Sequence, residues 1–172
     1  MIILKIDIIS DLEYIIYLYN LTSDIEFDSE ENIEKFLRQL FIKLKNFYNI
    51  TIEGYFDVDV YIDINYGIVL DLKKEKFEYY DYFDNQVEMK IVINRCKFLY
   101  LVDSFDFDCD KYELYNYLEK IYLLPKEKLS KIDISLLMEM STLIFNSDYI
   151  MNNGKKIIHH QIIITRLMTK IN

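Results

Sequence analysis

Hydrophobic residues along this chain repeat with two different periods, and each period predicts a different kind of secondary structure. Within residues 33–48 they recur every three or four positions, which is typical of a helix with one buried face. Glu31 and Lys35 lie four positions apart on the opposite side of this helix and favour it further. Within residues 56–62 every second residue is apolar, which instead predicts a strand that buries one face.

The period of two, or a short β-rich run, appears in several other segments. Strands are expected at residues 2–8, 56–62, 68–73, 87–93, 98–102, 112–117, 121–124 and 157–165. Asn65-Tyr66-Gly67 favours a tight turn, because Asn and Gly tolerate positive φ angles. Further hairpin turns are expected at residues 95–97 and 118–120. Residues 75–85 are aromatic and acidic without a clear period, and we leave them unassigned.

Three helices are expected, two near the N-terminus and one near the C-terminus. Ser10 and Glu13 match a capping box and predict a short first helix. Asp28 and Glu31 form a similar pair before the long second helix. The third helix would begin at Asp133. It would turn these apolar residues inward: Leu136, Leu137, Met140, Leu143 and Ile144.

These elements predict an α+β fold in a single domain that spans residues 1–172. An antiparallel sheet, built as a β-meander of hairpins, would pack against the two N-terminal helices and the C-terminal helix. No linker rich in Pro, Gly or Ser divides the chain, and its length is sufficient to bury a core. No long uncharged apolar run occurs, so no membrane span is expected.

Composition indicates the compartment and the kind of genome. Ile, Lys, Asn, Tyr and Phe are abundant and Trp is absent, which is typical of an AT-rich bacterial or viral genome. Only Cys96 and Cys109 are present, so we expect reduced thiols rather than a disulfide framework. The expected location is the bacterial cytoplasm, or the host cytoplasm if the protein is phage-encoded.

The net charge of −9 is concentrated in the middle of the chain. Residues 51–113 hold 15 acidic and 7 basic residues, whereas residues 114–172 hold 5 and 8. A negative region disfavours direct contact with nucleic acid, because phosphates attract Lys and Arg. It favours a basic protein or a cation as the partner.

Tyrosines and aspartates occur together in this acidic region. Strand alternation would place one set on a single face: Tyr55, Asp57, Asp59, Tyr61 and Asp63. A second set lies nearby in sequence: Tyr79, Tyr80, Asp81, Tyr82 and Asp84. Tyrosine gives a large contact area and carboxylates steer basic partners, so these residues are the candidate partner-binding surface. The alternative is a solvated face whose composition reflects codon usage.

Several kinds of chemistry are excluded by the residues present. Glycine occurs only at positions 54, 67 and 154, so neither a P-loop nor a dinucleotide-binding loop can form. Asp106, Asp108 and Asp110 have the spacing that begins a calcium loop, but the required Gly and Glu are replaced by Lys111 and Tyr117. His159 and His160 would point to opposite sides of a strand. No metal and no cofactor are therefore expected.

The leading hypothesis is a non-enzymatic cytosolic inhibitor that binds a basic protein through the acidic, tyrosine-rich sheet face. A toxin-immunity protein or a phage anti-defence protein would fit, with a toxin or a nucleic-acid-binding effector as the partner. No direct nucleic-acid or membrane partner is expected. A further alternative is an adaptor or structural subunit that forms homo-oligomers through exposed strand edges.

One motif supports an enzymatic alternative. The segment Ile68-Val-Leu-Asp71-Leu-Lys73, with an upstream acid at Asp57, Asp59 or Asp63, resembles the metal-dependent nuclease core of the restriction-endonuclease-like family. In that family two carboxylates hold Mg²⁺ and a lysine orients the attacking water. The resemblance covers only a short segment. It implies an Mg²⁺-dependent nuclease with Asp59, Asp71 and Lys73 at its centre.

Overall fold

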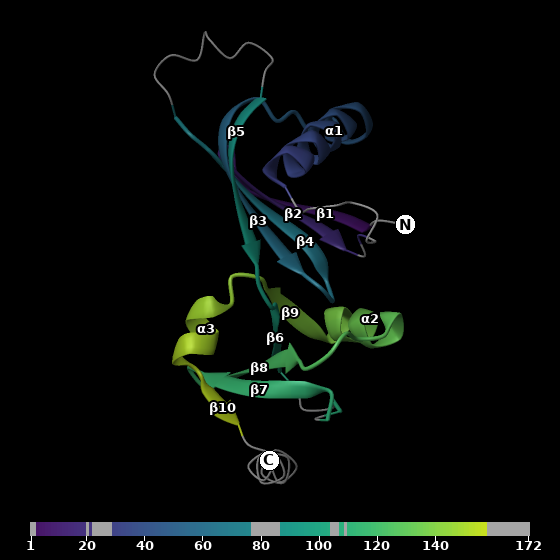
Figure 1. Ribbon diagram of the computed structural model, residues 1–172, viewed down its shortest axis with the longest axis vertical. Helices are drawn as coiled ribbons and strands as arrows, with labels where there is room; N and C mark the ends of the chain where they lie inside the picture. The colour runs from purple at the N-terminus through teal and green to yellow at the C-terminus, as the bar shows by residue number, and fades with distance from the viewer. Residues whose placement is uncertain are drawn as a thin grey trace. The chain divides into compact units, whose positions relative to one another are not determined.

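A computed structural model describes residues 3–19, 21, 29–76, 87–103, 107, 108 and 110–157. The chain divides into two compact units, the first with residues up to 62 and 67–95, the second with residues 63–66 and those from 96 onward. Among the described residues, each unit contains one five-stranded sheet (Figure 1). The expectation of one sheet packed against N-terminal helices is therefore wrong, because the protein is mostly β with two separate sheets. The assignment of residues 1–172 to a single domain stays a prediction.

The first sheet has the strand order β1-β2-β4-β3-β5. Its strands are β1 (Ile3–Ser10), β2 (Glu13–Tyr19), β3 (Gly54–Asp63), β4 (Gly67–Lys74) and β5 (Val87–Arg95). β1 and β2 form an antiparallel hairpin, and β2 also pairs antiparallel with β4. β3 and β5 run parallel, with Gly54 opposite Val87. This parallel pair overturns the predicted all-antiparallel meander.

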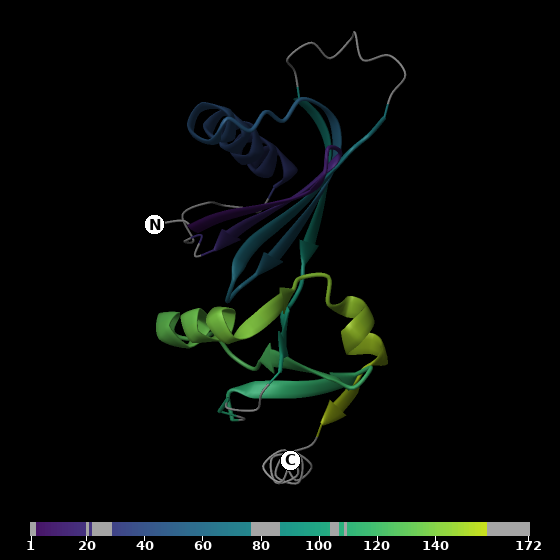
Figure 2. The ribbon, with the colours of Figure 1, turned by 180° about the vertical axis from the view of Figure 1, so that it is seen from behind.

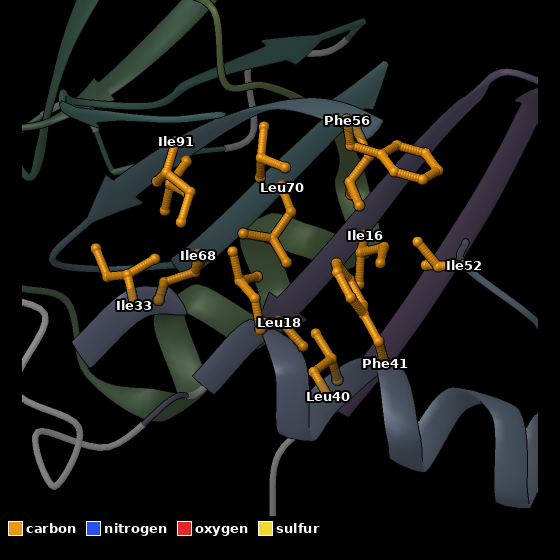
Figure 3. Packing of buried hydrophobic residues seen from close by; sticks show 14 of the residues in the cluster. Ile16, Leu18, Ile33, Leu40, Phe41, Ile52, Phe56, Ile68, Leu70 and Ile91 are labelled. Atoms are coloured by element: carbon orange, nitrogen blue, oxygen red, sulfur yellow. The ribbon is translucent and has the colours of Figure 1, made fainter. Parts of the chain in front are cut away.

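The helix α1 (Glu30–Tyr48) covers one face of the first sheet (Figures 1 and 2). It begins after Ser29, whose hydroxyl accepts the Asn32 N–H, and it ends at Asn49, which has a φ of 55°. Its apolar stripe follows the predicted period of three and four as far as Leu44, whereas Phe47 and Tyr48 at its end are exposed. Figure 3 shows this stripe packed on the sheet. The shared core includes Ile33, Leu37, Leu40, Phe41 and Leu44 from α1, with Ile16, Leu18, Phe56, Val58, Val60, Ile68, Leu70 and Leu72 from the strands.

The second sheet has the strand order β10-β7-β8-β6-β9, and its described strand pairs are antiparallel. Its strands are β6 (Leu99–Val102), β7 (Tyr112–Tyr117), β8 (Lys120–Pro125), β9 (Ser141–Ile144) and β10 (Lys155–Ile157). The unit also holds α2 (Lys131–Met140) and the short α3 (Asp148–Asn153). The predicted β7–β8 hairpin is confirmed, and Leu118 and Glu119 form its turn with φ angles of 49° and 60°.

The short helix expected after Ser10 is absent, because residues 13–19 form the strand β2. The Ser10 hydroxyl accepts the Leu12 N–H in the turn between β1 and β2 rather than capping a helix. Residues 14–19 are aromatic or aliphatic at every position, so their apolar residues fit the period of a strand as well as that of a helix. β-branched and aromatic residues favour a strand, and pairing with both β1 and β4 stabilises it.

Two further expectations fail for reasons of long-range pairing. β5 and β6 belong to different sheets, so residues 95–97 do not form the turn of a hairpin. Leu143 and Ile144 lie in β9, which pairs with β6, and so the helix expected from Asp133 onward, α2, ends at Met140. The expected last strand is described only as far as Ile157. None of the helices in the described part of the chain has the length and hydrophobicity needed to span a bilayer.

Candidate functional site

The candidate partner surface lies on the face of the first sheet that points away from α1. On β3, Phe56, Val58 and Val60 enter the core shared with α1. The residues that alternate with them therefore point to the opposite face. These are Tyr55, Asp57, Asp59 and Tyr61, each of which is half-buried. Of the five residues expected on this face of β3, these four lie on it.

Asp63 does not join this surface. It is only 5% exposed, and its carboxylate holds the chain around the turn that follows β3. Oδ1 accepts the N–H groups of Asn65 and Tyr66 at 2.7 and 2.8 Å, and Oδ2 accepts the N–H of Phe98 at 3.0 Å. All four residues belong to the second unit. The side chain of Asp63 therefore serves the local structure of that unit.

The second predicted group of tyrosines and aspartates cannot be placed on any surface. Tyr79, Tyr80, Asp81, Tyr82 and Asp84 lie outside the described residues. The candidate surface is therefore defined here by β3 and its neighbours in the first sheet.

Asp57 and Asp59 differ from three other acidic side chains on the described strands. Asp7, Asp71 and Glu113 each form an ion pair with a lysine at 2.8–3.0 Å. Asp57 and Asp59 form no ion pair within the described residues, although Lys90 lies opposite Asp57 on β5. Two half-buried carboxylates with no ion pair among the described residues leave negative charge on this strand that a basic partner would neutralise.

The three residues of the nuclease-like motif lie on neighbouring strands, Asp59 on β3 and the other two on β4. Lys73 Nζ lies 3.0 Å from Asp71 Oδ2. This hydrogen bond raises the pKa of Lys73 above its usual range, and the negative charge of Asp59 raises it further. The structure therefore brings together the residues that the resemblance selected.

Asp71 is 9% exposed, and its second carboxylate oxygen, Oδ1, is buried with no hydrogen-bond partner among the described residues. An unsatisfied buried acceptor is unfavourable, and a metal ion is one way to satisfy it. The described residues contain no group of three or more His, Cys, Asp or Glu side chains able to hold an ion, so a metal here would rest on the two carboxylates Asp59 and Asp71. We derive no metal-dependent step from this site.

A further cluster on the same sheet was not found from the sequence. Lys5 and Asp7 on β1 form an ion pair of 3.0 Å, and Lys5 Nζ lies 4.9 Å from the centre of the Tyr17 ring. Burial raises the pKa of Tyr17 to about 12, with the charge of Asp7 and a hydrogen bond to it as the next causes. The strand pattern of residues 2–8 placed Lys5 and Asp7 on one face. Tyr17 was missed because its segment was assigned to a helix.

We compared the chain with known protein families, with curated proteins and with solved structures, and none of them matches it.

Proposed function

We propose that this chain is a non-enzymatic cytosolic inhibitor that binds a basic protein through the face of β3 bearing Tyr55, Asp57, Asp59 and Tyr61. A toxin-immunity or phage anti-defence role is the version that fits best. The observation that carries the proposal is the absence of an ion pair at Asp57 and Asp59 within the described residues. Elsewhere on the described strands, several carboxylates are neutralised by a lysine of the same chain.

The arrangement suits a partner that is rich in arginine and lysine. Asp57 and Asp59 are two positions apart on one strand, so their carboxylates are held in a fixed spacing by the sheet. Tyr55 and Tyr61 flank them on the same face. Arginine pairs with carboxylates and stacks on aromatic rings, so one basic side chain would use both kinds of group. Surfaces rich in arginine and lysine occur in proteins that bind nucleic acids.

The experiment takes any basic toxin or nucleic-acid-binding effector that is found encoded near the gene, purifies it and titrates it against the chain. The variant Asp57→Lys/Asp59→Lys should lose at least about tenfold in affinity, and the wild-type affinity should fall as salt increases. Asp103→Lys/Glu139→Lys is the matched control, because it changes the net charge equally at exposed positions of the second unit. If Asp57→Lys/Asp59→Lys binds the partner as tightly as the control variant does, the proposal is contradicted.

The second candidate is the Mg²⁺-dependent nuclease, and one observation favours it. Asp71 and Lys73 are in contact, and Asp59 lies close enough to influence the pKa of Lys73. The test is cleavage of DNA and RNA with Mg²⁺ or Mn²⁺, compared with the Asp71→Asn variant. Cleavage that this variant abolishes would support an enzyme. Equal cleavage by the wild-type chain and the Asp71→Asn variant, or no cleavage by either, would count against an enzyme.

A further inference from the structure

The outer edge of β1 has features that fit a second copy of the same chain. β1 is the first strand in the order of its sheet, and among the described residues it pairs only with β2. An edge strand presents unpaired N–H and C=O groups that another strand can bind. Two large apolar residues of β1, Ile8 and Ile9, are 61% and 56% exposed. This edge therefore offers both backbone hydrogen bonds and apolar surface.

The charges on β1 are arranged symmetrically about Ile6. Lys5 precedes Ile6 and Asp7 follows it, and the two charged side chains share a face of the strand. If two copies of β1 pair antiparallel with Ile6 opposite Ile6, each Lys5 lies opposite Asp7 of the other copy. On the other face, Leu4 lies opposite Ile8. Both faces of the strand are therefore complementary to themselves.

The same charges disfavour the two nearest alternative registers. Only shifts by an even number of residues keep the core face of one copy continuous with that of the other, and the smallest of these are shifts of two residues. A shift in one direction places Lys5 opposite Lys5, and a shift in the other places Asp7 opposite Asp7. Like charges directly opposite one another destabilise a sheet. Lys5 and Asp7 together therefore favour the register with Ile6 opposite Ile6. A lysine alone on an edge strand would only discourage strand pairing.

The charged groups are accessible and already oriented. The side chain of Lys5 is 66% exposed and that of Asp7 is 34% exposed. The Tyr17 ring on β2 lies beneath the Lys5 ammonium and keeps it on this face. We propose that two copies of the chain associate antiparallel along β1, so that their first sheets become one continuous sheet. This self-association is independent of the partner surface on β3.

The experiment measures mass by sedimentation and light scattering from low to high micromolar concentration. The wild-type chain should change from 20.9 kDa to twice that mass as concentration rises. Lys5→Asp creates two like-charge contacts by symmetry and should raise the dissociation constant at least about tenfold. Lys5→Asp/Asp7→Lys restores opposite charges and should recover the wild-type constant. Lys35→Asp is the matched control, because this exposed lysine on α1 also forms an ion pair with an acid in its own chain.

A second measurement reports the register directly. In chains whose two native cysteines are replaced by serine, Lys5→Cys and Asp7→Cys are mixed and oxidised. Opposite positions on paired strands are close enough for a disulfide, so the mixed species should exceed both homodimers. A chain that stays at 20.9 kDa at all concentrations would overturn the proposal. A dimer that Lys5→Asp leaves intact, or that gives no excess of the mixed disulfide, would overturn it equally.

Discussion

Lys73 Nζ lies 3.0 Å from Asp71 Oδ2 on the same face of β4, whereas Asp71 Oδ1 is buried without a hydrogen-bond partner among the described residues. Replacing Lys73 alone should therefore lower the free energy of unfolding more than replacing Asp71 and Lys73 together. We expect Lys73→Met to lower the free energy of unfolding by about 1–3 kcal/mol, because it leaves a buried carboxylate without its cation. Asp71→Asn/Lys73→Met should recover most of this loss. Urea unfolding of the three proteins measures the difference, and a double variant no more stable than Lys73→Met would contradict this account.

Asp63 should be far more important for stability than Asp57, although both are aspartates on β3. Asp63→Ala leaves three backbone N–H groups without their acceptor. We expect a loss of about 3 kcal/mol or more, since hydrogen bonds to charged groups are stronger than neutral ones. Asp57→Ala is the control and should change stability by less than about 0.5 kcal/mol. Thermal unfolding followed by circular dichroism compares them, and equal effects would show that the turn does not depend on this carboxylate.

Tyr17 should make stability depend on pH under alkaline conditions. Its pKa is raised from an ordinary value of 10.0 to about 12 in the folded chain, first by burial and then by Asp7. Between these values the unfolded chain loses the phenol proton while the folded chain keeps it. The free energy of unfolding should therefore fall as pH rises through this window. Tyr17→Phe should remove that part of the slope in urea unfolding measured at several pH values. An unchanged slope would mean that Tyr17 ionises equally in both states.

Cys96 should react slowly with alkylating reagents while the chain is folded. Burial raises the pKa of this thiol to about 11, and the charges of Asp148 and Asp63 act in the same direction. Because only the thiolate reacts, we expect alkylation at mild alkaline pH about 100-fold slower than for an unfolded cysteine. The rate is measured by iodoacetamide labelling and mass spectrometry of a Cys109→Ser chain. Similar rates with and without urea would show that Cys96 is not protected.

Local patterns identified those elements whose formation depends on one segment. α1 was predicted because its apolar stripe repeats at the helical period, and β3 and β4 because they alternate around a turn at Asn65. The same alternation placed Asp57 and Asp59 on one face. The short segment at residues 13–19 defeated this reasoning, because a run that is apolar at nearly every position fits a helix and a strand equally.

The features that sequence reasoning missed depend on which distant strands pair. Nothing in the local pattern of β5 distinguishes a parallel neighbour of β3 from the first half of a hairpin with β6. The division of the strands into two sheets follows from such pairings. The same limitation applies to Asp63, which alternates correctly with Asp59 but is buried because the turn and Phe98 supply donors to its carboxylate.

The turn at residues 63–66 belongs to the second unit, while the strands on both sides of it belong to the first. Neither unit is therefore a continuous stretch of polypeptide. A fragment that starts at residue 96 lacks the carboxylate that accepts the Phe98 N–H. Expression of residues 96 onward alone would therefore not yield the second unit intact.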